Sequence, residues 1–161
     1  MKWLAIVTST IAALIILAVV MLYKIKYPTY AYRYRMTVTV DVGGEARSGS
    51  SVIEVRVSKQ PRFLPEVLPL DQSMRGQAVF VGLPGGKNIV ALLASGSTAE
   101  NGGFPEQVVP DHFKLNLFDD RALARLPELR GHWELGIDSM PTLVTVADAN
   151  DGNRYELPRL R

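Results

Sequence analysis

The chain contains no cysteine, which excludes a disulfide framework and the acylated cysteine of a bacterial lipoprotein. This absence does not decide the compartment, because reducing and oxidising spaces both hold proteins without cysteine. Histidine is scarce as well: only His112 and His132 occur, and neither has a second histidine at metal-ligand spacing. The nearest approach to a metal site is His112 with Asp111, Asp119 and Asp120, which we interpret as solvated loop residues. We therefore expect no metal and no cofactor, and no motif predicts a catalytic residue.

Acidic residues are missing from the first 40 positions, so the two signs of charge are divided unevenly. Up to Arg35 the chain carries five lysines and arginines and no acid, a charge of +5. The other 13 of the 18 basic residues are set against all 16 acidic residues, which leaves the remainder at −3. Because binding to phosphates needs a basic patch on a folded surface, we expect no nucleic-acid partner.

Long hydrophobic runs are absent except at the start, where the 21 residues from Trp3 to Tyr23 are uncharged and mostly apolar. A helix of this length measures about 31 Å, and the hydrocarbon core of a bilayer is about 30 Å thick. We therefore predict a transmembrane anchor over residues 1–24, with the lipid bilayer as a partner. A cleaved secretory signal is disfavoured, because its apolar core has only roughly 7–15 residues and a small-residue cleavage site follows it.

Two considerations about the orientation of this anchor oppose each other. Four basic residues follow the run within a dozen positions, whereas only Lys2 and the amino terminus precede it, and the positive-inside rule places the more basic side in the cytoplasm. A short N-terminal anchor before a larger domain in bacteria commonly exports that domain. We expect the second arrangement, a single-pass protein of the bacterial inner membrane with a periplasmic domain.

Residues 25–35 combine tyrosines with cations, a composition that suits the headgroup layer of a membrane. We predict an interfacial collar there, continuous with the end of the anchor. Its membrane-interface residues are Tyr23, Lys24, Lys26, Tyr27, Tyr30, Tyr32, Arg33, Tyr34 and Arg35.

Small residues form a strip along the first half of the predicted anchor. Ala5, Thr8, Ser9 and Ala12 fall on one side of a helix, where small side chains let two transmembrane helices approach closely. The strip predicts a helix-packing surface for a second copy or for a membrane partner.

The remaining residues, 36–161, predict a single β-rich globular domain. Residues 34–42 and 50–58 each alternate apolar and polar positions and flank Gly43-Gly44, which indicates an antiparallel hairpin. A second hairpin is expected from 77–81 and 88–94. Its second arm has no polar residue from Ile89 to Ala94, as in a central strand covered on both faces.

Three further features complete the predicted domain. A fifth strand is expected over 142–147, ahead of an Asp-Gly turn at 151–152, and a sixth at His132-Trp133-Glu134 with the indole in the core. Proline punctuates 59–75, and glycine, serine and asparagine are frequent over 95–110, so both segments are expected to be loops. The one predicted helix of the domain is Asp119 to Leu126. The fold class is therefore an N-terminal transmembrane helix plus a mainly antiparallel, β-rich α+β domain with one short helix.

Three segments carry a resemblance: Tyr32-Arg33-Tyr34-Arg35, the strand from Gly49 to Val55, and Pro141-Thr142-Leu143-Val144-Thr145. In these segments the chain resembles a group of small uncharacterised bacterial single-pass membrane-anchored proteins. The resemblance implies the same architecture and a bacterial inner membrane. The group has no known activity, so it implies no site residues.

Three functions remain open from the sequence. The first is a membrane-tethered, non-enzymatic β-domain that binds another protein or an envelope component, since loops on a rigid sheet commonly form binding surfaces. The second is an accessory subunit of a larger membrane complex, recruited through the small-residue strip. The third is a hydrolase that uses His112 with the nearby aspartates.

Overall fold

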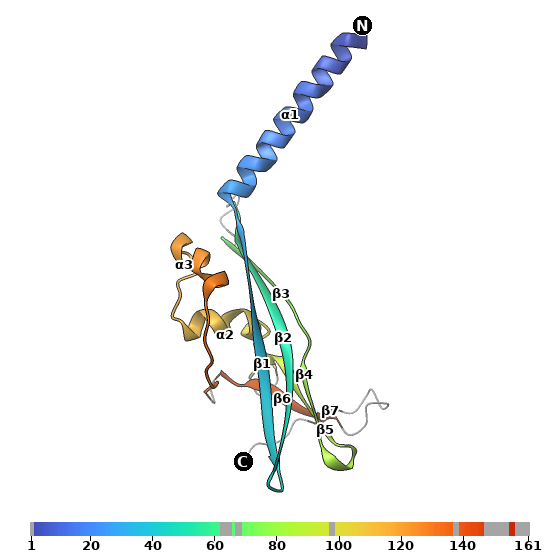
Figure 1. The fold of residues 1–161 in the computed structure, drawn as a ribbon, viewed down its shortest axis with the longest axis vertical. Coiled ribbons are helices and arrows are strands. Elements are labelled where there is room, and N and C mark those ends of the chain that lie inside the picture. Colours follow the sequence, from blue (N-terminus) through green and yellow to red (C-terminus); the bar gives the residue numbers. More distant parts are fainter. Residues whose placement is uncertain are drawn as a thin grey trace.

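The computed structural model describes residues 2–61, 66, 69–96, 99–136, 139–146 and 155–156. The chain begins with α1 (Lys2–Lys26), a helix that projects away from the sheets (Figure 1). Its segment Ile6–Lys26 is long and apolar enough to cross a membrane, and the most apolar window within it has no buried residue. Pro28 lies just beyond the helix, where a residue that cannot donate a backbone hydrogen bond prevents its continuation.

The first sheet confirms the predicted hairpin and extends it. It contains β1 (Thr29–Val42), β2 (Glu45–Lys59) and β3 (Leu70–Arg75), antiparallel and in that spatial order. The turn between β1 and β2 uses Gly43 and Gly44 at φ values of 64° and 88°, which glycine adopts without strain. β3 occupies part of the segment predicted to be a loop. The prediction was wrong because the prolines lie before β3, and Leu70, Gln72 and Met74 alternate in burial with their exposed neighbours.

The second sheet confirms the second predicted hairpin. Its order is β4-β5-β6-β7, from β4 (Val79–Gly82), β5 (Asn88–Ser95), β6 (Pro141–Val146) and β7 (Tyr155–Glu156), and a 3-10 turn η1 (Pro84–Gly86) joins β4 to β5. β5 is an inner strand, as predicted, but most of its side chains are only half-buried, so it is not covered on both faces. The predicted Asp-Gly turn at 151–152 lies outside the described residues.

The domain has more helix than the single short one predicted. α3 (Asp120–Arg125) is the expected helix, with the Asp119 carboxylate accepting a hydrogen bond from the Arg121 N–H at its start, and a 3-10 turn η2 (Leu126–Glu128) follows it. α2 (Phe104–His112) lies where a loop was predicted. α2 contains Pro105 and Pro110, and proline usually ends a helix, so the local sequence does not predict one here.

One core joins the two sheets and the helices. The inner face of the first sheet presents Tyr32, Met36, Ile53, Val55 and Val57 to side chains of α2, α3 and the second sheet. The contributions from those elements include Phe104, Val108, Val109, Leu123, Leu126, Val79, Val81 and Ala91.

The two sheets approach each other closely at Gly49. A Cβ atom placed there would lie 2.0 Å from the Phe80 carbonyl oxygen, so only glycine allows β2 and β4 to meet at this distance.

Candidate functional site

The site is a groove beside β1, and two tyrosines of β1 position the helix that forms its end. Pro110 has no N–H, so the Glu106 carbonyl four residues earlier in α2 lacks its intrahelical donor. The Tyr32 hydroxyl donates to this carbonyl at 2.9 Å, and the Tyr34 hydroxyl donates to the Pro105 carbonyl at 3.0 Å. Burial raises the pKa of both phenols well above the usual range, so both stay protonated donors at neutral pH.

Opposite β1 runs the segment Arg130–Leu135, here called the wall. Trp133 fixes it to the end of α2: its ring stacks on the His112 ring at 4.1 Å between centroids and 6° between planes, and it meets the Phe113 ring edge-on at 5.6 Å. The predicted strand at His132-Trp133-Glu134 is not formed in the structure. The wall has strand-like alternation, with Trp133 and Leu135 half-buried between exposed neighbours, but no strand pairs with it among the residues that the structure describes.

Between β1 and the wall lies a cavity of about 1220 Å³, which we call the β1 groove. It is bounded by every residue of β1 from Ala31 to Thr39, by residues 129–135, by Val108, Val109 and Phe113 from the α2 end, and by the start of β6. Side chains of a strand point alternately to its two faces, so a cavity that contacts consecutive residues borders the edge of the strand.

The edge of β1 along this groove has no strand partner among the described residues. β1 is the outermost strand of its sheet and pairs only with β2. Its register with β2 is continuous from Thr29 to Val42, without a bulge, and no proline interrupts it. Proteins usually protect sheet edges with bulges, prolines, short strands or a covering element, so a long regular edge beside an open groove is a template for another strand.

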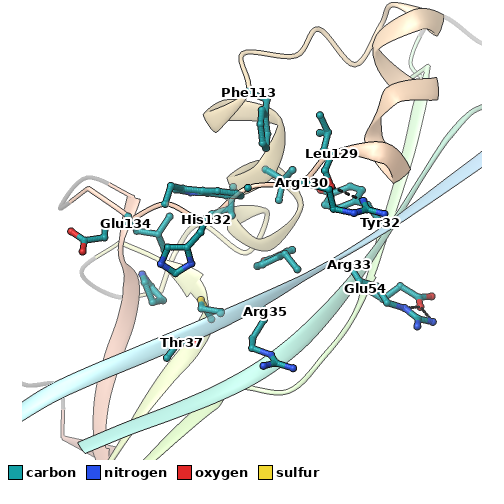
Figure 2. Close-up of a pocket in the computed structure, with 18 of the residues that line it drawn as sticks. Tyr32, Arg33, Arg35, Thr37, Glu54, Phe113, Leu129, Arg130, His132 and Glu134 are labelled. Atoms are coloured by element: carbon teal, nitrogen blue, oxygen red, sulfur yellow. Dashed lines mark hydrogen bonds and ion pairs between the residues drawn. The ribbon is translucent and has the colours of Figure 1, made fainter. Parts of the chain in front are cut away.

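Three arginines and two glutamates line the groove. Figure 2 shows Arg33 paired with Glu54 across the strands, at 2.6 Å between Nη2 and Oε2, whereas Arg35 stands alone on β1. Arg56 also binds Glu54, and the hydrogen bonds from Arg33 and Arg56 hold the pKa of this carboxyl below its ordinary value. The glutamate is therefore neutralised on both sides, and Arg35 keeps no acidic partner within the described structure.

The wall adds one more cation to the groove. Arg130 donates to the carbonyls of Pro127 and Leu129 at 2.9 and 2.7 Å, so its guanidinium is bound to neutral groups only. In Figure 2 the His132 ring is turned toward β1, and the Glu134 carboxylate is turned away from it. An anionic group entering the groove would meet Arg35 and Arg130 without competition from Glu134.

The predicted membrane-interface residues divide into two groups. Tyr32 is 6% exposed and Tyr34 is half-buried, and both hydroxyls bind α2, so for these two the predicted contact with lipid headgroups is replaced by contacts within the protein. Arg33 is held by Glu54, and Arg35 borders the groove.

At the end of α1, the Tyr23 and Tyr27 rings lie 5.0 Å apart and the Lys26 ammonium lies over the Tyr27 ring. For Tyr23, Lys24, Lys26, Tyr27, Tyr30, Arg33 and Arg35 the interfacial position stays a prediction.

Two of the aspartates considered with His112 as a possible site make contacts elsewhere in the structure. Asp119 begins α3, and Asp120 forms an ion pair with Lys59 at 2.6 Å between Oδ1 and Nζ. No group of three metal-ligating side chains occurs in the part of the chain that the structure describes. His112 itself is exposed and stacked on Trp133.

The small-residue strip lies on the free surface of α1, where Thr8, Ser9 and Ala12 are exposed. The side chain of Ala5 is outside the described set. The helix-packing role of the strip stays a prediction.

Comparison with protein-family models, with curated proteins and with solved structures finds no match to this chain. The resemblance to small membrane-anchored bacterial proteins therefore stays a prediction.

The sequence predicts β1 and the alternation of the wall, but it does not predict that these two segments lie across a groove from each other. Sequence reasoning also missed Arg130 and Leu129, since nothing local marks a loop arginine as part of a groove. The one available signal was the strand-like pattern at 132–134, which has no pairing partner adjacent in sequence.

Proposed function

We propose that this protein is a membrane-tethered, non-enzymatic binding domain that captures an extended segment of a partner protein along the free edge of β1. The observation that carries the proposal is the groove along that edge, from Ala31 to Thr39. Strand addition to an exposed sheet edge is a recurring mode of peptide recognition, in which main-chain hydrogen bonds supply affinity and side-chain contacts supply specificity.

The dimensions of the groove support a strand as the ligand. From Ala31 to Thr39 a strand advances about 26 Å at about 3.3 Å per residue. A segment of about nine extended residues matches this length. A pocket for a small molecule is usually smaller, roughly 300–1000 Å³.

In this proposal α1 spans a bacterial inner membrane once and carries the domain on the periplasmic side. The length and composition of Ile6–Lys26 support the span. Only Tyr27 and Pro28 separate α1 from β1, so the groove would begin close to the membrane surface. Reporter fusions at the C-terminus test the orientation: alkaline phosphatase is active only outside the cytoplasm, and an inactive fusion beside an active cytoplasmic reporter would reverse this part of the proposal.

Site-specific photo-crosslinking in the native membrane tests the capture of a strand. A photoreactive residue at Thr37, on the β1 edge, and another at His132, in the wall, should label the same short segment of the same partner. Phe80 is the matched control, because it is 54% exposed on β4 and does not line the groove. Labelling from Phe80 of that same segment, or no labelling from Thr37 and His132, would contradict the proposal.

A further inference from the structure

We infer that the captured segment inserts as a strand between β1 and the wall, pairs with both, and alternates apolar with acidic side chains. This inference rests on the proposed function and names the chemistry of its ligand. The inference adds the wall as a second pairing partner, whereas strand addition to β1 needs only the edge of β1.

The wall alternates in burial as a strand does, but it is not paired as one. From Arg130 to Leu135 no backbone N–H or C=O makes a hydrogen bond with another residue that the structure describes. Backbone groups in a folded domain are usually paired, and unpaired ones persist where water or a ligand reaches them. Residues 130–135 also line the groove, so these unpaired donors and acceptors lie beside it, across from the free edge of β1.

Aromatic packing holds the wall in place while these groups are unpaired. The stack of Trp133 on His112, together with the edge contact to Phe113, attaches the wall to α2. The tyrosine hydrogen bonds in turn attach α2 to β1. The two edges are thus linked through α2, so an inserted strand meets a site whose two sides are already positioned.

The two faces of β1 indicate which side chains the inserted strand should have. On the inner face of β1, Met36 is buried and Val38 is half-buried, and Leu135 and Leu143 also line the groove. On the outer face, Arg35 is exposed between Arg33 and Thr37, and it has no acidic partner in the described structure. Side chains of an inserted strand alternate between these two surroundings, so apolar residues would face inward and acidic residues would face Arg35.

Synthetic nine-residue peptides test the inference on the full-length protein in nanodiscs. A peptide that alternates valine with aspartate should bind, as followed by Trp133 fluorescence in a Trp3→Phe background, and a valine–lysine peptide should bind at least about tenfold more weakly. Arg35→Glu should reverse this preference. Arg47→Glu is the matched control, because Arg47 is an exposed β2 cation paired with Glu45 away from the groove.

N-methylation of the peptide separates the inference from the proposed function. The N–H groups of a strand point alternately to its two edges, so methylating every second residue blocks one edge only. If the peptide pairs with β1 and with the wall, either alternate set of methyl groups should lower affinity by at least about tenfold, since each set removes the N–H donors of one edge. If only one set matters, the strand pairs with β1 alone, and the inference fails while the proposed function stands. If neither set matters, both fail.

Discussion

The Tyr32 hydroxyl helps to hold α2 in position through its hydrogen bond to the Glu106 carbonyl. Tyr32→Phe removes the donor to the Glu106 carbonyl, which Pro110 has already deprived of its helical partner. Loss of a partner costs about 1–3 kcal/mol for a buried group, and this bond is partly buried, so we expect the free energy of unfolding to fall by about 1 kcal/mol, measured by urea denaturation. Tyr30→Phe, at a half-buried tyrosine of the same face, should change stability by less than about 0.5 kcal/mol.

Combining this change with Pro110→Ala tests the cause. Alanine restores an N–H that can bond the Glu106 carbonyl, so Tyr32→Phe should cost less in that background. Equal costs in both backgrounds would show that Tyr32 stabilises the domain by packing and not by replacing the missing donor.

A second prediction for a single residue concerns Gly49. Gly49→Ala places a methyl group 2.0 Å from the carbonyl oxygen of Phe80, and neither backbone can move without separating the sheets. We expect a loss of about 3 kcal/mol or more in the free energy of unfolding. Gly102→Ala is the control, because nothing lies within 4 Å of its Cβ position, and it should be close to neutral. A Gly49→Ala protein of normal stability would mean that the sheets do not meet at this point.

At the scale of the element, the ion pairs of Glu54 link β1 to β2 and make the hairpin sensitive to pH. Hydrogen bonds from Arg33 and Arg56 lower the pKa of Glu54 in the folded protein. The contribution to stability is therefore present above the unfolded pKa of about 4.3 and is lost as pH falls through the lower folded value. Carbon NMR titration of the Glu54 carboxyl should show the lowered pKa.

The same titration in variants separates the two arginines. Arg33→Gln and Arg56→Gln should each raise the pKa of Glu54 toward its ordinary value, and Glu54→Gln should reduce the loss of stability below about pH 4.3. An unchanged Glu54 titration in both arginine variants would show that these surface pairs are not maintained in solution.

At the scale of the whole molecule, α1 and the domain are independent in their packing. The exposed window of α1 contributes nothing to the core, which is built from β1 onward. A protein lacking residues 2–25 should therefore fold, and the slowest-exchanging amides should remain those of Ile53, Val55 and Val57, as in the full-length protein. Hydrogen exchange measures this, and loss of protection in β2 after truncation would show that the anchor stabilises the domain.

Much of the architecture follows from local patterns, and the failures have identifiable reasons. Alternation predicted β1 and β2, because a half-buried strand repeats every two residues, and an apolar run without a polar residue predicted β5. α2 was missed because glycine, serine and asparagine are frequent over 95–110 and predicted a loop. Tertiary contacts outweigh that composition: Phe104 and Val109 are buried, and two tyrosines bind the first turn of the helix.

The amino-acid sequence by itself determined the apolar N-terminal helix, the two hairpins and the uneven charge, since each depends on residues close together along the chain. Only the tertiary structure decided that Tyr32 and Tyr34 bind α2, and that the wall lies across a groove from β1. The physical reason is distance along the chain: the Tyr32 contact spans 74 positions. Such contacts depend on how the sheets and helices share one core, and no local pattern of residues carries that information.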